Sequence, residues 1–198
     1  MSFEHYYTSN PTSAVIEKQI TFQLRDKNLA LVSVSGVFGF SDYVDKASQM
    51  LIRAFTPSGK NTLDLGCGFG AIGLSAKLFF PNLNVTLSDI NTRAVEYCKK
   101  NAQLNNLDVN ILASDLFCEF PDNTYSDIIS NPPIAVGKVF LSKLIDESYA
   151  HIEHGGALWL VGFHNKGGST IKKIMQERFG NSTDVEKGGG IRVYKSVK

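Results

Sequence analysis

Short strand-like segments alternate with helical segments along most of this chain, and this alternation limits the fold more than any other feature. The strand-like runs are apolar, and the segments between them space their apolar residues for one face of a helix. Strands are expected over residues 61–65, 84–88, 109–112, 125–130 and 157–161, and helices over residues 71–79, 93–105, 141–154 and 169–179. Repeated strand–helix units predict an α/β fold with a doubly wound parallel sheet whose ligands bind at the strands' carboxyl ends.

Further segments flank this alternation. Two runs alternate apolar and polar residues around Arg25-Asp26-Lys27, which predicts a β-hairpin. One more helix is expected over residues 43–55, and two more short strands over residues 182–186 and 191–195. Because the 198 residues are 43% hydrophobic without a break in composition, we expect a single domain over residues 1–198. It would divide into an N-terminal arm and hairpin, residues 1–42, and a Rossmann-like core, residues 43–198.

Composition excludes several classes of protein. No apolar stretch approaches the length of a membrane span, and the N-terminus, Met1 to Tyr7, is too polar for a signal peptide. We therefore expect a soluble, cytoplasmic protein with no membrane partner. The three cysteines are widely spaced and odd in number, so neither a disulfide framework nor a metal site is expected. The four histidines, His5, His151, His154 and His164, are interpreted as structural or solvated.

A glycine-rich loop joins the first core strand to its helix. Gly66, Gly68 and Gly70 alternate with other residues directly before the helix expected from Ala71. Glycines let a backbone approach a ligand, and a helix N-terminus presents N–H groups and the positive end of its dipole. The loop predicts a ligand with hydroxyls or charge. It also meets the relaxed dinucleotide fingerprint with Asp89 as the downstream acid, so an oxidoreductase stays open at this point.

Acidic residues after successive strands favour S-adenosylmethionine over a dinucleotide. Asp64 precedes the loop, where a pyrophosphate would be repelled but the cationic amino group of a methionine would be attracted, directly or through water. Asp89 closes the next strand and could accept from the two ribose hydroxyls. Asp115 follows the third strand and could accept from an adenine amino group. For Asp115, an ordinary loop or cap residue is the alternative.

The sequence Asn131-Pro132-Pro133-Ile134 follows the strand expected over residues 125–130. Each proline fixes its own φ and holds the preceding residue extended. The Asn131 amide and the Pro132 carbonyl could then accept both N–H bonds of an exocyclic amine and leave the nitrogen facing an electrophile. The pattern predicts methyl transfer to a planar nitrogen, and a simple Asn-Pro turn is the alternative.

These motifs resemble the class I S-adenosylmethionine-dependent methyltransferases, and within them the RsmC-like, small-domain ribosomal RNA guanine-N2 methyltransferases, in particular the stand-alone archaeal type. The resemblance covers nearly the whole chain. It rests on residues 36–38, Asp45, 64–70, 89–91, 101–105, 114–116, 131–134, 137–138 and 187–193. It implies a seven-stranded, mostly parallel Rossmann-like sheet whose last strand is antiparallel.

The resemblance also implies roles for individual residues. Those expected to bind S-adenosyl-L-methionine are Asp45, Asp64, Gly66, Gly68, Gly70, Asp89, Ile90, Asp115, Leu116 and Asn131. Those expected to act in catalysis are Asn131, Pro132 and Pro133, and those expected to contact substrate are Phe38, Ile134 and Lys138. The chain departs from the pattern at Ile134, where many relatives carry an aromatic able to stack on the target base, and at Ala47, where some carry glycine.

Charge is uneven along the chain. Residues 61–137 carry four Lys/Arg against eight Asp/Glu, and residues 138–198 carry ten against six. The basic third could contact phosphates of RNA, with ribosomal RNA expected and tRNA as the alternative RNA. Its candidates are Lys138, Lys166, Lys172, Lys173, Arg192 and Lys195, with Lys138 first because it follows Asn131 closely. An ordinary solvated, Lys-rich surface is the other interpretation.

Other functions stay open from the sequence. A protein-glutamine N5 methyltransferase uses the same Asn-Pro-Pro logic on an amide nitrogen, usually with an aromatic fourth residue. A DNA adenine methyltransferase would need a target-recognition region for which this chain has little room. A non-catalytic S-adenosylmethionine-binding protein associated with RNA would keep the cofactor pocket without turnover.

Overall fold

The computed structural model describes residues 10–24, 26–120, 122 and 124–198, so residues 1–9 of the expected arm, His5 included, and Arg25 of the expected turn lie outside the described residues. Seven strands form one sheet in the order β5-β4-β3-β6-β7-β9-β8. Their bounds are β3 Asn61–Leu65, β4 Asn84–Asp89, β5 Asn110–Ala113, β6 Tyr125–Ser130, β7 Ile152–Phe163, β8 Thr183–Gly188 and β9 Ile191–Val197. β3 to β7 are parallel and β9 is antiparallel to both neighbours, which confirms the expected fold.

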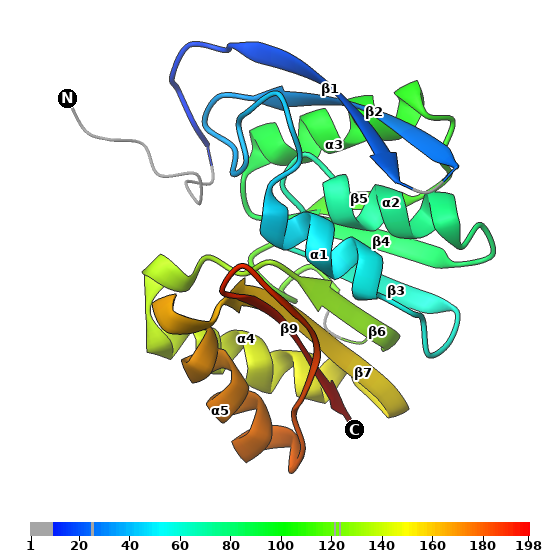
Figure 1. Ribbon diagram of the computed structural model, residues 1–198. Coiled ribbons are helices and arrows are strands. Elements are labelled where there is room, and N and C mark those ends of the chain that lie inside the picture. The colour runs from blue at the N-terminus through cyan, green and yellow to red at the C-terminus, as the bar shows by residue number, and fades with distance from the viewer. Residues whose placement is uncertain (1–9, 25, 121, 123) are drawn as a thin grey trace.

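Helices cover both faces of the sheet (Figure 1). One face carries α1 (Lys46–Ala54), α2 (Ala71–Phe79) and α3 (Thr92–Leu104), and the other carries α4 (Lys138–His151) and α5 (Gly168–Phe179). Neighbouring strand residues point to opposite faces. Ile129 and Trp159 accordingly pack with the first group of helices, whereas Ile128, Leu158 and Leu160 pack with the second.

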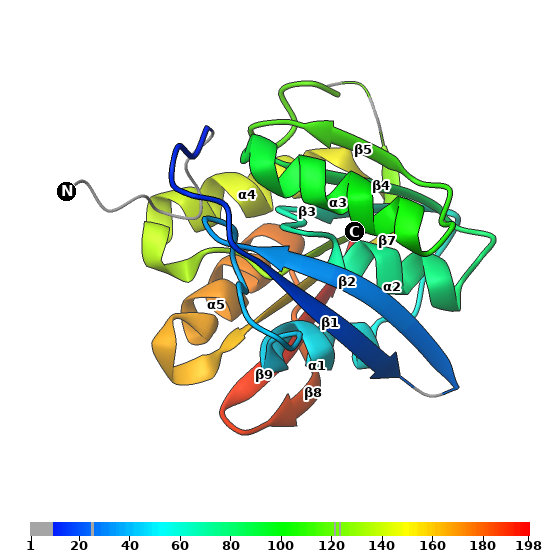
Figure 2. The same cartoon turned by 90° about the horizontal axis from the view of Figure 1, so that it is seen from above.

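The N-terminal hairpin consists of β1 (Glu17–Leu24) and β2 (Lys27–Val34) and lies across α2 and α3 (Figure 2). Asn101 of α3 bonds to both backbone polar groups of Val32, accepting from N–H at 2.8 Å and donating to the carbonyl at 3.1 Å. Asn105, one turn later, bonds in the same way to Ala30. Asn101 also donates to the carbonyl of Phe69 in the glycine loop at 2.8 Å, so the hairpin is tied to the site.

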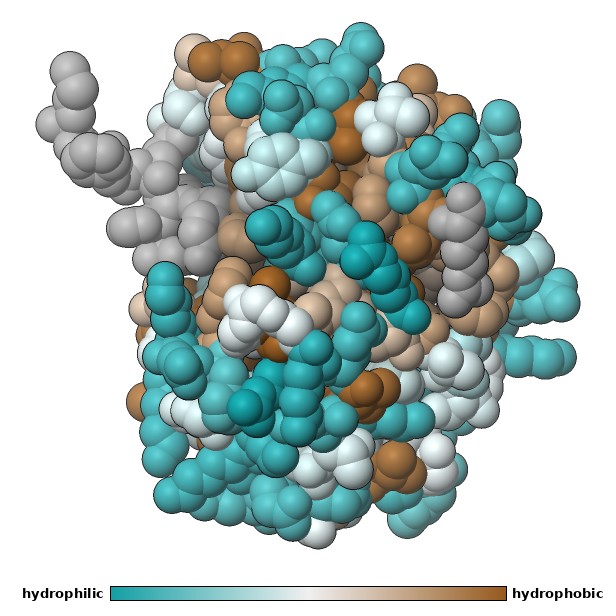
Figure 3. Space-filling model, viewed as in Figure 1, coloured by the Kyte–Doolittle hydropathy of each residue, from teal (hydrophilic) through white to brown (hydrophobic). Residues whose placement is uncertain are grey.

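Polar and charged side chains cover most of the face shown in Figure 3, and apolar side chains appear there in separate small patches. This face carries α1, α5 and the β8–β9 hairpin. No helix in the described part of the chain combines the length and the apolar character needed to cross a membrane.

Several element boundaries differ from the sequence expectation. α1 begins at Lys46, not at residue 43, because the Asp45 carboxylate caps it by accepting from the N–H groups of Ala47 and Ser48, both at 3.0 Å. α4 begins at Lys138, directly after Gly137, which has φ 102° and can therefore turn the chain sharply into the helix. β7 begins at Ile152, so the strand is twelve residues long.

Candidate cofactor and substrate site

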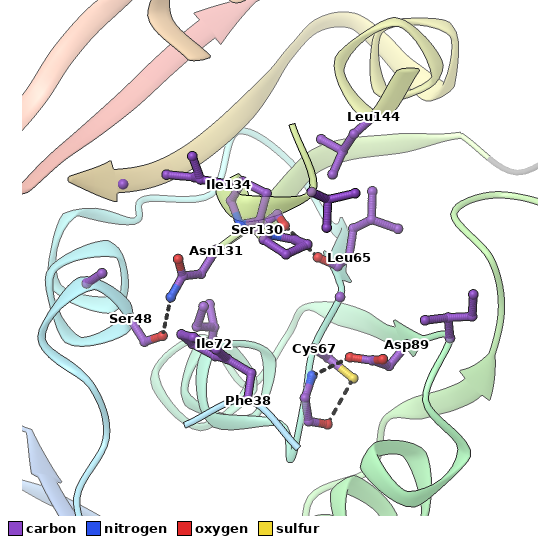
Figure 4. A pocket seen from close by; sticks show the side chains of 18 of the residues that line it. Phe38, Ser48, Leu65, Cys67, Ile72, Asp89, Ser130, Asn131, Ile134 and Leu144 are labelled. Carbon is purple, nitrogen blue, oxygen red and sulfur yellow. Dashed lines mark hydrogen bonds between the residues drawn. The ribbon is translucent and has the colours of Figure 1, made fainter. Parts of the chain in front are cut away.

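A cavity of about 490 Å³ opens at the carboxyl ends of the parallel strands. Its walls come from the loop after β2, the first turn of α1, the glycine loop after β3, the ends of β4 to β7 and one face of α4. The volume lies within the range of small-molecule sites, about 300–1,000 Å³. Asn131 and Asp89 lie on opposite sides of this cavity (Figure 4).

The glycine loop presents its backbone to the cavity. Gly66 and Gly68 have φ values of 74° and 55°, which favour glycine, and a Cβ at Gly66 would meet no atom within 4 Å. This open backbone suits close approach of a ligand. Gly70, expected to bind cofactor, does not line the cavity. It caps α2 with φ 96°, and a Cβ there would lie 2.7 Å from the Cys98 sulfur, so its smallness serves packing.

Asp89 is held rigidly in the cavity wall. Its Oδ2 accepts from the N–H of Gly68 at 2.8 Å, and its Oδ1 accepts from the N–H of Asn91 at 2.9 Å. Burial raises the pKa of this carboxyl, and the backbone N–H groups of Asn91, Gly68 and Ile90 oppose that effect. A fixed carboxylate is a suitable acceptor for a sugar diol.

Three further predicted residues line the same end of the cavity: Ile90, which is 36% exposed, Asp115 and Leu116. The apolar side chains of Ile90 and Leu116 suit a planar base, and the Asp115 carboxylate could accept from its amino group. The acidic and apolar groups therefore fit the adenosyl part of S-adenosylmethionine, and the open Gly66 backbone leaves room for the ligand.

Asp64 lies elsewhere than expected. It is fully buried and does not line the cavity, so it does not face the methionine amino group directly. Its Oδ2 instead accepts from the N–H of Gly73 at 2.7 Å, which holds the first turn of α2 under the loop. Burial raises the pKa of Asp64 to about 7. The expectation failed because the side chain of a strand residue points to one face of the sheet rather than along the strand.

Asn131 directly follows β6, and its amide has a defined orientation. Its Nδ2 donates to the Ser48 hydroxyl at 3.1 Å (Figure 4). The same Nδ2 lies 3.5 Å from Oδ1 of Asp45. Because a carboxylate only accepts, the amide NH₂ group must face α1. No described residue donates to Asn131 Oδ1, which is left as an acceptor in the cavity wall. Asp45, which also lines the cavity, thus both caps α1 and orients Asn131.

The two prolines after Asn131 line the cavity and lead into the short 3₁₀ helix η1 (Ile134–Val136). Ile134 borders the cavity, but its side chain fills the space above two glycines. A Cβ on Gly167 would lie 2.2 Å from Ile134 Cγ2, and one on Gly162 would lie 2.9 Å from its Cδ1. Ile134 therefore fastens this segment to the end of β7, a role that the sequence expectation of substrate contact did not include.

The basic residues are placed differently from the expectation. Lys138 is exposed and outside the cavity lining, although Phe140 and Leu144 of the same helix line it. Lys138 lies two positions before Phe140, so its side chain points away from the face of α4 that lines the cavity. Lys166, in the 3₁₀ helix η2 (His164–Lys166), lines the cavity instead. Phe38 lines it as expected and is 41% exposed.

Several other cations of the basic third, candidates and Lys187 alike, are already paired. Lys172, Lys187 and Arg192 lie 2.7, 3.2 and 2.8 Å from the oxygens of Asp184, which is 5% exposed. Burial alone would raise the pKa of Asp184, but Lys172 and Lys187 outweigh it and lower the pKa to about 2. Lys173 lies 3.8 Å from Glu177. Lys195 lies 4.4 Å from the centre of the Trp159 ring.

Sequence reasoning did not assign Ser48 or Phe163 to the site, and it named Lys166 only as one of several candidate cations for phosphate contact. The available signal was position, since Phe163 and Lys166 follow a strand whose carboxyl end faces the site. Cys67 also lines the cavity, but the Cys98 thiol and burial raise the pKa of its thiol well above the usual value. No histidine occurs among the described residues of the lining, whose carboxylates are those of Asp45, Asp89 and Asp115.

Comparisons with known proteins agree with this geometry. The family model described as "Methyltransferase small domain" matches residues 28–195. The uncharacterized protein YbxB of Bacillus subtilis is 35% identical over 98% of this chain and 98% of its own length, and this full-length relative is bacterial rather than archaeal. The ribosomal RNA small subunit methyltransferase C of Salmonella arizonae is 31% identical over 92% of this chain but only 55% of its own length. The chain thus spans about half of that enzyme.

A solved structure shares the fold. It is the RsmC of T. thermophilus, described as a 16S rRNA N2 G1207 methyltransferase in complex with AdoMet and guanosine. It superimposes with a TM-score of 0.80 at 21% identity, over 95% of this chain and 52% of the other. The fold, the cavity and these matches define a class I methyltransferase of the RsmC-like type with S-adenosylmethionine as its cofactor. The chain belongs to the methyltransferase small domain family.

Proposed function

We propose that this protein transfers a methyl group to an exocyclic amine of RNA, with guanine N2 of small-subunit ribosomal RNA as the target. The observation that carries the proposal is the orientation of Asn131. Its NH₂ group is turned toward Ser48 and Asp45, so its Oδ1 faces away from them as an acceptor, and Pro132, the next residue, also lines the cavity. Two acceptors on consecutive residues suit the two N–H bonds of one primary amine.

S-adenosylmethionine, when bound, supplies an electrophilic methyl group. The chain supplies positioning: Asp89, Ile90, Asp115 and Leu116 would hold the adenosyl part, and the Gly66 backbone would border it. The exocyclic nitrogen of guanine is a poor nucleophile because its lone pair is delocalised into the ring. Asn131 and Pro132 would hold that nitrogen and stabilise the positive charge that develops on it. The product amine is acidic enough to lose its proton to water, so no side-chain base is required.

Two findings support RNA as the substrate class. The relatives that match most of this chain include enzymes named as ribosomal RNA small subunit methyltransferase C, and the T. thermophilus structure contains guanosine. A base inside a duplex cannot reach the cavity, so the target base must be unpaired or flipped out.

The test is methyl transfer from labelled S-adenosylmethionine to unmodified small-subunit ribosomal RNA and to tRNA, with the nucleosides identified by mass spectrometry. N2-methylguanosine is the expected product. N6-methyladenosine would refute guanine as the target, a labelled release-factor peptide would favour the protein-glutamine function, and the absence of transfer with intact cofactor binding would favour a non-catalytic protein.

Variants of Asn131 separate catalysis from binding. Asn131→Ala removes the positioning acceptor but most of the cofactor contacts stay, so methyl transfer should fall by about 10²-fold or more at nearly unchanged cofactor affinity. Asn131→Asp keeps an acceptor and should retain partial activity. The measurements are turnover at saturating cofactor and a calorimetric binding constant for each variant. If Asn131→Ala kept wild-type turnover, the Asn-Pro-Pro segment would act only as a rigid turn and would not position the substrate.

A further inference from the structure

Phe163 and Lys166 lie close together at the end of β7, and both line the cavity that Asn131 borders. Phe163 is the last residue of β7 and is 44% exposed, although large apolar side chains are usually buried. Lys166 is exposed, lines the cavity and places its Nζ 5.8 Å from the centre of the Phe163 ring. Neither residue is used by the methyl-transfer chemistry described above.

Lys166 differs from the cations of the basic third that are already paired, and unlike Lys138 it lines the cavity. Lys172, Lys187 and Arg192 share the carboxylate of Asp184. Within the described ranges, Lys166 has no carboxylate within ion-pair distance. Its charge is therefore available to an anion that enters the cavity mouth.

The segment that carries both residues is fixed on several sides. The backbone N–H of His164 donates to the Gly190 carbonyl at 2.8 Å, and its Nδ1 lies 2.9 Å from the hydroxyl of the buried Tyr194. On the other side, Ile134 fills the space above Gly162 and Gly167. The same contact joins this segment to Asn131-Pro132-Pro133. A ligand here would meet a preorganised surface at a set position relative to Asn131, which lowers the ordering cost of binding.

The charges of the cavity restrict what the ligand can be. Asp89 and Asp115 make one end acidic, so a phosphate is repelled there, and the Lys166 side is the favourable path for a polyanion. An aromatic face stacks on any nucleobase, and a neighbouring lysine binds the backbone phosphate. On the basis of the proposed function, we infer that Phe163 and Lys166 form a nucleotide subsite for an unpaired base and its phosphate in the RNA strand.

The test uses a fluorescently labelled, single-stranded RNA oligonucleotide containing guanine, bound to the full chain in the presence of S-adenosylhomocysteine. Loss of one base stack corresponds to roughly 5- to 150-fold weaker binding, and we expect this for Phe163→Leu. Phe163→Tyr keeps the ring and should bind within a few-fold of wild type. Tyr43→Leu is the matched control, because Tyr43 is 60% exposed and outside the cavity lining.

Lys166→Gln tests the phosphate contact separately. The slope of log K against log salt should become shallower by about 0.7, the value for one phosphate of a single strand. Lys99→Gln, an exposed lysine on α3 outside the lining, should leave the slope unchanged. Calorimetry should give the wild-type affinity for S-adenosylhomocysteine in all of these variants.

Several results would overturn the subsite. Phe163→Leu could bind RNA like wild type, or it could lose S-adenosylhomocysteine affinity by the same factor as RNA affinity, which would make Phe163 a cofactor residue. Undetectable RNA binding by wild type would also refute it. Wild type that binds RNA through Phe163 but makes no methylguanosine would refute the proposed function and leave the subsite standing. Guanine methylation that is unchanged in Phe163→Leu would leave the proposed function standing and refute the subsite.

Discussion

At the scale of single residues, the side chains around the cavity act mainly by fixing acceptors in defined directions. Asp45 caps α1 and also lies 3.5 Å from the amide nitrogen of Asn131, so it helps to fix the direction of the Asn131 amide oxygen. Asp89 is held by the backbone N–H groups of Gly68 and Asn91, so it meets a ligand with its carboxylate already ordered. Such preorganisation reduces the entropy lost on binding.

Ser48→Ala should lower turnover without unfolding the protein. Ser48 is 5% exposed, and its hydroxyl accepts from Asn131 Nδ2 at 3.1 Å. Loss of one hydrogen bond, about 0.5–1.5 kcal/mol, corresponds to about 2- to 13-fold in kcat if Asn131 then leaves its productive orientation. The measurement is methyl transfer at saturating RNA and cofactor.

The control for this variant is Ser75→Ala, which removes the same atom from a buried serine of α2 whose hydroxyl donates to Ala71. Ser75→Ala should lower the free energy of unfolding about as much as Ser48→Ala does, and it should leave kcat unchanged. An equal fall of kcat in both variants would show that stability, not the orientation of Asn131, explains the effect.

At the scale of elements, α3 joins the N-terminal hairpin to the cofactor loop. The edge of β2 has backbone groups that a sheet partner would normally satisfy, and the side chains of Asn101 and Asn105 take that place. Because Asn101 also donates to Phe69, the hairpin and the glycine loop share one buried residue. The hairpin therefore supports the site.

Asn101→Ala should destabilise the fold by about 2–4 kcal/mol, since it leaves buried backbone groups of Val32 and Phe69 without their partner. Asn105→Ala breaks the equivalent bonds to Ala30 in a more exposed place and should cost about 1 kcal/mol. Urea unfolding midpoints of the two variants give the comparison. An equal loss of unfolding free energy in the two variants would contradict the expectation that the buried hydrogen bonds of Asn101 stabilise the fold more than those of Asn105.

At the scale of the whole molecule, the two faces of the sheet have separate apolar cores, and the site lies where the strands end between them. Asp64 is a fully buried carboxyl within this arrangement. Its pKa is raised to about 7 by burial, from an ordinary value near 4. At pH values between about 4 and about 7, Asp64 is therefore protonated in the folded protein and ionised in the unfolded chain.

It follows that the contribution of Asp64 to stability should fall as pH rises from about 4 to about 7 and stay constant above that, a total of about 4 kcal/mol. Asp64→Asn should remove this dependence while its amide oxygen still accepts from Gly73 N–H. The measurement is the unfolding free energy of both proteins at intervals between pH 4 and 8. A pH profile that is the same in both would contradict a raised pKa at Asp64.

The order of strands and helices along the chain could be predicted from the sequence alone, because apolar periodicity and glycine positions are local properties. The bounds of β3, α2 and β6 match their expectation residue for residue. Alternating glycines and the Asn-Pro-Pro segment likewise identified the loops around the cavity. These signals need no knowledge of distant contacts.

The side chains that face the cavity could not be predicted in the same way, because their directions depend on the packing of distant elements. Lys138 and Lys166 both follow a strand end closely, yet only Lys166 lines the cavity. Asp64, in β3, bonds to the N–H of Gly73, and Gly70, in the glycine loop, packs against Cys98, so neither lines the cavity. The orientation of Asn131 depends on Ser48, 83 residues earlier in the chain. The physical reason is that side-chain direction follows from the phase of each helix or strand against its neighbours, which long-range packing fixes.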